Sequence, residues 1–225
     1  MDAKTRAAHA AADRVTSGMT LGLGTGSTAA LFVAELGRRV QAGTLRDLVG
    51  VATSRATAAL AKSFGIALVD EDDCPALDLA IDGADEIDPS GDAVKGRGGA
   101  LLREKVVVQA ARRFLCIADE SKLVPRLGST GPLPVEVVPY AWKARARWLG
   151  LWGDVTLRER DGKPFVTDNG NMILDVSFAD GIHDPESLQA ELSLRAGIAE
   201  HGLFLHCISE AIIGREGGVE VRTFG

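Results

Sequence analysis

Residues 77–104 combine a strand pattern, an acidic turn, a glycine cluster and the start of a helix. The apolar run Leu77–Ile81 has the length of a buried strand. It stops at an Asp-Gly-Ala-Asp turn, residues 82–85, which places two carboxylates where the strand should end. A buried strand that leads through a polar turn into a helix predicts an open α/β sheet, in which ligands bind outside the carboxyl ends of the strands.

Four polar side chains of this stretch are candidates for that edge of the sheet. They are Asp82, Asp85, Lys95 and Glu104, and Lys95 is followed by glycines at 96, 98 and 99. Carboxylates can take up and return protons, and an amine can stabilise a growing negative charge. The acids do not follow the calcium-loop pattern of alternate ligands with a glycine sixth and a glutamate twelfth. The stretch therefore predicts proton transfer without a metal site.

Glu104 lies on the apolar side of its predicted helix. When residues 99–113 are projected at about 100° per residue, five apolar residues fall on one side: Ala100, Leu101, Val107, Val108 and Ala111. Glu104 falls in the middle of them, and a buried carboxylate is costly unless it has a use. The helix dipole favours a glutamate anywhere in the first turn, but it does not explain the apolar side. The pattern therefore favours a functional glutamate.

A second polar turn follows the predicted strand Met19–Leu23. Gly24-Thr25-Gly26-Ser27-Thr28 leads into an apolar helix over 29–40, and such turns can bind anions with backbone N–H groups and hydroxyls. As a dinucleotide fingerprint the turn meets only the looser form that ends in Ala29, and Thr53-Ser54 stand where a ribose-binding acid would be expected. No Gly-Lys-Ser/Thr follows, so the turn is not a P-loop. Phosphate binding and a simple tight connection both remain open.

Two lysines are further candidates for anion binding. Lys122 follows the predicted strand Phe114–Ala118, at a strand's carboxyl end, and Lys4 lies in an Ala-rich helical start. A solvated surface lysine is the commoner reason for either position. Only the strand-end position of Lys122 favours a phosphate neighbour.

The composition excludes several classes of protein. A net charge of −6 argues against nucleic acid as the main partner. The three cysteines form no CxxC pair, so they indicate neither a disulfide framework nor a zinc site. No signal-peptide core and no apolar run of membrane length occurs, which predicts a cytoplasmic enzyme with no membrane partner.

Residues 134–206 show a different order of predicted elements from the rest of the chain. Strand, helix, strand, strand, helix and strand follow one another, with Asp161-Gly162 and Asn169-Gly170 as turn signals and a last strand near 202–207. This β-α-β-β-α-β order is typical of a ferredoxin-like α+β unit. We predict a Rossmann-like, mostly parallel sheet domain over 1–131 plus 207–225, with the ferredoxin-like domain inserted at 132–206.

Six motifs in this order resemble the family of type A ribose-5-phosphate isomerases. They are GLGTGSTA at 22–29, IDGADEID at 81–88, KGRGGALLREK at 95–105, CIADESK at 116–122, PLPVEV at 132–137 and TDNGN at 167–171. The resemblance runs over nearly the whole chain. It implies interconversion of ribose 5-phosphate and ribulose 5-phosphate without a cofactor, in a homodimer or homotetramer.

The resemblance also implies roles for individual residues. Glu104 matches the family's catalytic base, and Asp82, Asp85 and Lys95 match residues that handle the sugar hydroxyls, ring opening and the enediolate. The substrate-binding residues implied are the following: Lys4, Thr25, Gly26, Ser27, Thr28, Asp82, Gly83, Ala84, Asp85, Lys95, Gly96, Arg97, Gly98 and Lys122. Arg97 departs from the family, in which many members have glycine, and its cation could reach the substrate or point outward.

Two alternatives remain at this stage. A sugar-phosphate deaminase or lactonase on a related fold would be expected to use a histidine, and no histidine lies in residues 77–104. A non-enzymatic sugar-phosphate sensor would usually carry a DNA-binding segment. About 18 residues precede the first predicted strand, which is too short for such a domain.

Overall fold

The computed structural model describes residues 1–70 and 72–224; Glu71 and Gly225, the last residue of the predicted first domain, lie outside it. The chain divides into two compact units. Unit 1 consists of Met1–Ala84, Arg103–Lys122 and Cys207–Gly225, and unit 2 of Asp85–Leu102 and Leu123–His206. The predicted boundaries at 132 and 206 assign residues 85–102 and 123–131 differently. The strands of residues 85–102 pair within unit 2, which accounts for this difference.

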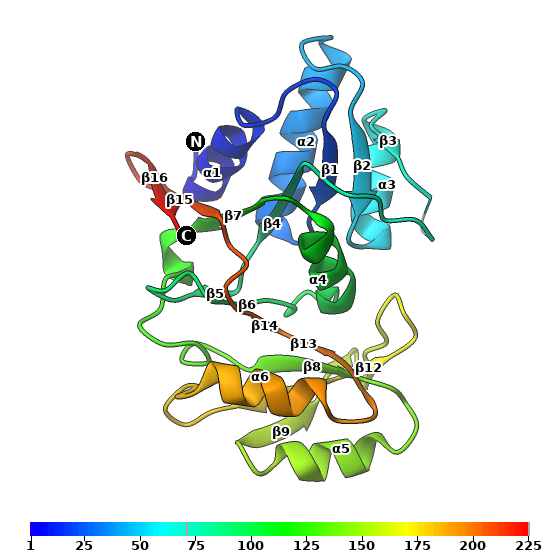
Figure 1. The fold of residues 1–225 in the computed structure, drawn as a ribbon, viewed down its shortest axis with the longest axis vertical. Coiled ribbons are helices and arrows are strands. Elements are labelled where there is room, and N and C mark those ends of the chain that lie inside the picture. The colour runs from blue at the N-terminus through cyan, green and yellow to red at the C-terminus, as the bar shows by residue number, and fades with distance from the viewer. Residues whose placement is uncertain (71, 225) are drawn as a thin grey trace. The chain divides into compact units, whose positions relative to one another are not determined.

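Unit 1 contains a seven-stranded sheet in the order β16-β15-β7-β4-β1-β2-β3 (Figure 1). Over the described residues its neighbouring strands run parallel, except for the β15–β16 pair. Its elements are α1 (Ala3–Ala12), β1 (Thr20–Leu23), α2 (Ser27–Gln41), β2 (Val49–Ala52), α3 (Arg55–Ser63), β3 (Ala67–Leu68), β4 (Leu79–Gly83), α4 (Leu101–Ala110), β7 (Phe114–Asp119), the 3₁₀ turn η1 (Glu120–Lys122), β15 (Glu210–Arg215) and β16 (Gly218–Thr223). Two residues of α4, Leu101 and Leu102, belong to unit 2.

The two faces of this sheet are buried by different helices. Leu21 and Leu23 of β1 belong to one apolar cluster with Phe32 and Leu36 of α2 and with residues of α1. On the other face, a Cβ at Gly22 would collide with Val107 of α4. A parallel sheet covered on both faces needs nearly continuous apolar strands, which is why its short strands could be recognised in the sequence.

The strand order reverses between β1 and β4. From β1 the chain proceeds to β2 and β3 on one side, and from β4 to β7 and β15 on the other. In open α/β sheets the crevice at such a switch point, beyond the carboxyl ends of the strands, is the usual ligand site. The turn after β1 and the end of β4 therefore lie where a ligand site is expected.

Unit 2 contains a four-stranded antiparallel sheet in the order β13-β8-β12-β9. Its elements are β5 (Glu86–Ile87), β6 (Ala93–Val94), β8 (Leu133–Val137), α5 (Trp142–Leu149), β9 (Asp154–Leu157), β10 (Glu159–Arg160), β11 (Lys163–Pro164), β12 (Met172–Ser177), α6 (Pro185–Ser193), β13 (Ile198–His201) and β14 (Leu203–Phe204). Leucines of α5 and α6 pack with those of β8 and β12 in one core. This arrangement confirms the predicted α/β fold with a smaller ferredoxin-like part.

One strand of unit 2 lies elsewhere than the sequence predicts. The last strand of the four-stranded sheet is Ile198–His201, whereas the pattern places a strand near 202–207. Leu203–Phe204 instead pairs with β6, which also pairs with β5, in a separate three-stranded sheet. The three tryptophans are partly buried against the core of unit 2.

Candidate active site

Asp82 belongs to strand β4, not to the turn that the apolar pattern predicts. The strand continues through Gly83, and Asp82 lies opposite Cys116 of β7. The Asp82 side chain is buried, with 2% of the residue exposed. Its Oδ1 accepts hydrogen bonds from the backbone N–H groups of Thr25, at 3.0 Å, and of Gly83, at 2.7 Å. Two backbone donors therefore fix this carboxylate at the switch point.

Gly24 allows the turn after β1 to approach Asp82 closely. A Cβ at this position would collide with the Asp82 carboxyl group and with its Cα. The Gly24 N–H also donates to the carbonyl of Ile81 at 2.9 Å. The ends of β1 and β4 are thus joined by backbone hydrogen bonds, and any side chain at position 24 would separate them.

The first turn of α2 combines several groups that favour negative charge. Gly26 is its N-cap residue, with a φ of 108°, and it provides no side chain to satisfy the first N–H groups of the helix. Ser27 and Thr28 begin the helix, and Lys4 Nζ donates to Ser27 Oγ at 3.2 Å. Backbone donors, hydroxyls and the helix dipole favour negative charge here, and Lys4 adds a full positive charge.

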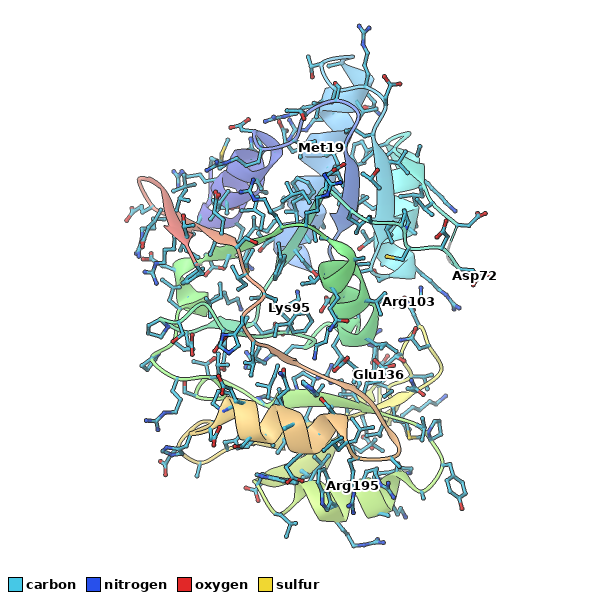
Figure 2. All side chains as sticks on the ribbon, in the orientation of Figure 1. Met19, Asp72, Lys95, Arg103, Glu136 and Arg195 are labelled. Atoms are coloured by element: carbon cyan, nitrogen blue, oxygen red, sulfur yellow. The ribbon has the colours of Figure 1, made fainter. Side chains whose placement is uncertain are left out.

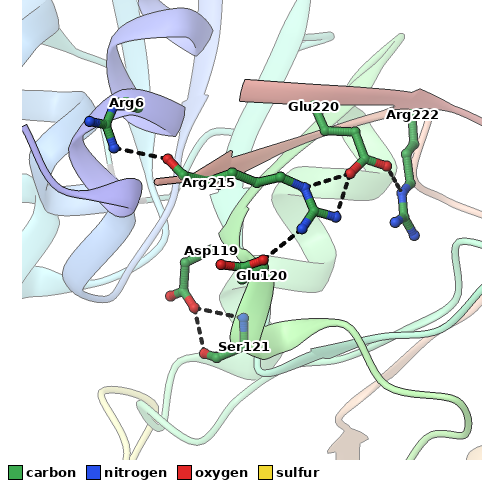
Figure 3. Close-up of polar contacts among 7 residues, drawn as sticks. All are labelled: Arg6, Asp119, Glu120, Ser121, Arg215, Glu220 and Arg222. Atoms are coloured by element: carbon green, nitrogen blue, oxygen red, sulfur yellow. Dashed lines mark hydrogen bonds and ion pairs between the residues drawn. The ribbon is translucent and has the colours of Figure 1, made fainter. Parts of the chain in front are cut away.

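Lys122 and Lys4 both act electrostatically on Asp119 at the end of β7. Burial opposes the charged form of Asp119, but hydrogen bonds from Ser121 and the charges of Lys122 and Lys4 hold its pKa below the ordinary value. Figure 3 shows the bonds between Ser121 and Asp119 in the segment that leads to Lys122. The two lysines therefore lie near one carboxylate, within the same unit as the turn 24–28.

Arg215 links the two segments that carry these lysines. Its carbonyl accepts a hydrogen bond from Arg6 of α1 at 2.9 Å, and its guanidinium binds Glu120 of η1 at 2.6 Å (Figure 3). Glu220 of β16 accepts two more bonds from the same guanidinium. These contacts join α1 and η1 through the β15–β16 hairpin.

Glu104 is buried on the sheet-facing side of α4, as the helical projection predicts, with 3% of the residue exposed. Val107, one turn later on the same side of the helix, lies over Gly22 of β1, where an added Cβ would collide with it. The helix connects two parallel strands, so its first turns lie at their carboxyl end. Glu104 and Asp82 therefore share one edge of the sheet.

In unit 2, Lys95 is held beside strand β14. Its N–H donates to the carbonyl of Gly202 at 2.9 Å, and its Nζ lies 5.4 Å from the ring centre of Phe204. The Lys95 side chain is labelled in Figure 2. The residue is 2% exposed. Asp85 begins the same unit, and its N–H donates to the carbonyl of Val94 at 2.8 Å. Both candidates are thus fixed through the short β5–β6–β14 sheet.

Arg97 is paired with Glu86. Its Nη2 lies 2.7 Å from Glu86 Oε1, and its backbone N–H donates to Asp85 Oδ2 at 2.9 Å. Glu86 is fully buried and also accepts from Gly128 N–H and from the N–H and hydroxyl of Thr130. Burial would raise the pKa of Glu86, but the bonds from Thr130, Arg97 and Gly128 outweigh it and lower that pKa. The Arg97 side chain therefore serves an ion pair within unit 2.

The predicted residues fall into two groups by unit. Unit 1 holds Lys4, the turn 24–28, Asp82–Ala84, Glu104 and Lys122; unit 2 holds Asp85 and Lys95–Gly98. Arg158 donates to the carbonyls of both Gly96 and Arg97, at 3.0 Å each, and so supports the loop before the exposed Gly98.

Sequence reasoning missed two supporting features. From the sequence, Glu86 stands out only as part of the IDGADEID motif. Thr53-Ser54 stand out only because a ribose-binding acid is missing at that position. Glu86 directly follows the candidate residue Asp85, and Thr53-Ser54 directly follow strand β2. A polar residue in such a position could have been considered as a support for the site. Among the described residues, no group of three His, Cys, Asp or Glu side chains could hold a metal ion. Within the same residues, no helix is long and apolar enough to cross a membrane.

Comparisons with known proteins agree with this geometry. Residues 49–218 match the family model of ribose 5-phosphate isomerase A (phosphoriboisomerase A). The chain is 53% identical to "Ribose-5-phosphate isomerase A" of Thermomicrobium roseum, over 97% of this chain and 92% of that protein. It is 46% identical to "Probable ribose-5-phosphate isomerase 3, chloroplastic" of Arabidopsis thaliana, over 99% and 83%.

Solved structures give the same result. The ribose 5-phosphate isomerase from Plasmodium falciparum superposes with a TM-score of 0.94 at 35% identity, covering 98% of this chain and 97% of that one. A D-ribose-5-phosphate isomerase in complex with phospho-erythronic acid has the same score and coverage at 39% identity. From the strand order, the switch-point turn and these matches, we conclude that this chain belongs to the ribose 5-phosphate isomerase A family.

Proposed function

We propose that this chain interconverts D-ribose 5-phosphate and D-ribulose 5-phosphate, the aldose–ketose isomerisation of the non-oxidative pentose phosphate pathway. The observation that carries the proposal is Glu104, a carboxylate that is 3% exposed at the same sheet edge as Asp82, in a chain 53% identical to a protein of that name. A sensor has no need of a buried base, and a deaminase or lactonase on a related fold would be expected to use a histidine.

Glu104 is the proposed base that moves the proton between C2 and C1. Its carboxylate removes the proton from C2 of the open-chain aldose, and the C–H electrons form the C1–C2 double bond of an enediolate. The carbonyl electrons move to O1, where the Lys95 ammonium is proposed to stabilise the negative charge. Glu104 then returns its proton to C1, the O2 proton is transferred to O1, and the ketose results.

The remaining candidates are proposed to bind the substrate. The N–H groups and hydroxyls of Gly26, Ser27 and Thr28 suit the phosphate, together with the cations of Lys4 and Lys122. Asp82 and Asp85 suit the sugar hydroxyls, since an ionised carboxylate can only accept hydrogen bonds. Arg97 contributes through its backbone bond to Asp85, because its guanidinium is used by Glu86.

We also propose that the protein acts in the cytoplasm as a homodimer or homotetramer. Two observations support assembly. The family that the chain resembles forms homodimers or homotetramers, and unit 2 has exposed apolar side chains at Tyr140, Leu151 and Leu194. Light scattering at several protein concentrations tests it, and a monomer at all of them would contradict it.

Incubation of the purified protein with ribose 5-phosphate in D₂O, followed by NMR, tests the function. The expected result is formation of ribulose 5-phosphate with deuterium entering at the position to which the proton moves. Phospho-erythronic acid should inhibit the reaction competitively. A wild-type protein that leaves ribose 5-phosphate unchanged would contradict the proposed function, whatever the roles of single residues.

A further inference from the structure

Four hydroxyl groups meet behind the turn 24–28. Thr25 Oγ1 lies 2.7 Å from Thr53 Oγ1, 2.9 Å from Ser54 Oγ and 3.1 Å from Thr57 Oγ1. Thr53, Ser54 and Thr57 are buried, while Thr25 is partly exposed. The three buried residues lie at the end of β2 and in the first turn of α3, and none of them is a predicted substrate residue. We refer to Thr53, Ser54 and Thr57 as the hydroxyl cluster.

Each hydroxyl has one hydrogen to donate, and each member of the hydroxyl cluster has an acceptor within reach. Thr53 donates to the carbonyl of Leu23 at 3.1 Å, and Thr57 donates to the carbonyl of Gly24 at 2.9 Å. A carbonyl oxygen can only accept, so the direction of both bonds is fixed. Ser54 donates to Thr57 at 3.0 Å. The Ser54 and Thr57 hydroxyls therefore form a chain that ends on the Gly24 carbonyl, whereas Thr53 can donate either to Leu23 or to Thr25.

Thr25 donates its own hydroxyl hydrogen to Ser54 Oγ at 2.9 Å, at the start of this chain. The backbone N–H of Thr25 is also in use, because it donates to Asp82 Oδ1. Thr25 thus has no donor to offer a phosphate, and its hydroxyl oxygen can serve a ligand only as an acceptor.

We propose that Thr53, Ser54 and Thr57 are positioning residues that turn the Thr25 hydroxyl into a hydrogen-bond acceptor for a sugar hydroxyl of the substrate. This inference rests on the proposed function for the identity of the substrate. It divides the turn: Gly26, Ser27 and Thr28 receive the anion, while Thr25 and the adjoining Asp82 receive hydroxyl hydrogens. Through the Gly24 carbonyl and the Thr25 hydroxyl, the cluster also fixes the segment whose N–H holds Asp82.

The test compares two ligands that do not react. Inorganic phosphate carries only the anion, and D-ribitol 5-phosphate adds the hydroxyl groups without a carbonyl. Binding of both is measured by calorimetry at constant ionic strength for wild type, Thr25→Val and Lys122→Ala. Thr25→Val should weaken ribitol 5-phosphate roughly 5- to 10-fold, the loss of about one neutral hydrogen bond, and leave phosphate unchanged. Lys122→Ala should weaken both ligands. Equal weakening of both ligands by Thr25→Val, or of neither, would overturn the assignment.

The positioning role is tested at Thr57. Thr57→Val keeps the shape and removes the hydroxyl, so it should lower ribitol 5-phosphate affinity and kcat/KM in the same way as Thr25→Val. Thr57→Ser restores the hydroxyl and should recover most of both. Ser63→Ala, which removes an exposed hydroxyl of the same helix α3, is the matched control and should resemble wild type. If Thr57→Ser is as impaired as Thr57→Val, packing is responsible and the proposal fails. Since binding needs no turnover, an inactive wild type would count against the proposed function only.

Discussion

Two glycine-containing loops of the protein, 24–28 in unit 1 and 95–99 in unit 2, are held in place by different chemistry. The first is supported mostly by neutral hydroxyls and backbone groups, through Thr57, Thr53 and the Gly24 carbonyl, with one carboxylate, Asp82, bound to the Thr25 N–H. The second is supported by charge, through the Glu86–Arg97 pair and the Arg158 bonds to the loop carbonyls.

This difference predicts that the two loops respond to different perturbations. Neutral hydrogen bonds change little with pH, whereas a buried ion pair fails when its carboxylate is protonated. The three tryptophans of the chain, at 142, 148 and 152, all belong to unit 2. Tryptophan fluorescence therefore reports on the unit that contains the ion pair.

The largest expected effect is that of Glu86→Ala. The change leaves Arg97 without its carboxylate and two backbone N–H groups, of Gly128 and Thr130, without an acceptor. Breaking a buried pair in this way costs about 3–5 kcal/mol of unfolding free energy. Urea unfolding followed by tryptophan fluorescence measures it. Glu86→Gln keeps an acceptor oxygen and should cost less; equal stability of Glu86→Ala and wild type would mean that the pair does not hold the loop.

Lys122→Ala should raise KM for ribose 5-phosphate while kcat changes less. A charge-assisted bond to phosphate contributes roughly 1.5–3 kcal/mol, or about 10- to 150-fold. The contact is the same in the ground state and the transition state, so it acts on binding. Steady-state kinetics at fixed ionic strength decide the point. A collapse of kcat at constant KM would assign Lys122 to the chemistry instead.

Acid should remove the contribution that Glu86 makes to the unfolding free energy of unit 2. Because its folded-state pKa lies below 4.5, the ordinary value for glutamate, its stabilisation is present above that pH and is lost as the pH falls through the lowered pKa. The difference in urea midpoint between wild type and Glu86→Ala should therefore be constant near neutrality and shrink in acid. A difference that grows as the pH falls would reverse the sign of this argument.

Removal of divalent metals should have the smallest effect. The proposed electrophile is Lys95, and the proposed phosphate ligands are protein groups. Activity after dialysis against EDTA should equal that of an untreated sample. If activity falls strongly and a divalent ion restores it, a metal ion stabilises the charge on the substrate, and the roles proposed for Lys95 and the phosphate-binding groups are wrong.

The features predicted best from the sequence are those with a periodic pattern. The apolar side of α4 located Glu104, and the strand–turn–helix succession located Gly24 and Thr25. The end of β4 was placed too early, because Asp82 breaks the apolar run although its backbone continues the sheet. The pairing of β5, β6 and β14 had no signal, because two-residue strands have no periodicity. Thr25 meets the hydroxyl cluster from about 30 residues away in the chain, and Glu86 meets Gly128 and Thr130 from more than 40 residues away. Only the fold brings these groups together.

The central claim is that Glu104 is the base, and the kcat of Glu104→Gln tests it most directly. Glutamine keeps the shape of the side chain and removes its ability to take a proton. General-base catalysis contributes typically about 10²–10⁴-fold, so kcat should fall by at least that range while KM changes little. Deuterium incorporation from D₂O should disappear together with turnover. A Glu104→Gln protein whose kcat stays within about tenfold of wild type would contradict the account, and the base would then be sought at Asp82 or Asp85.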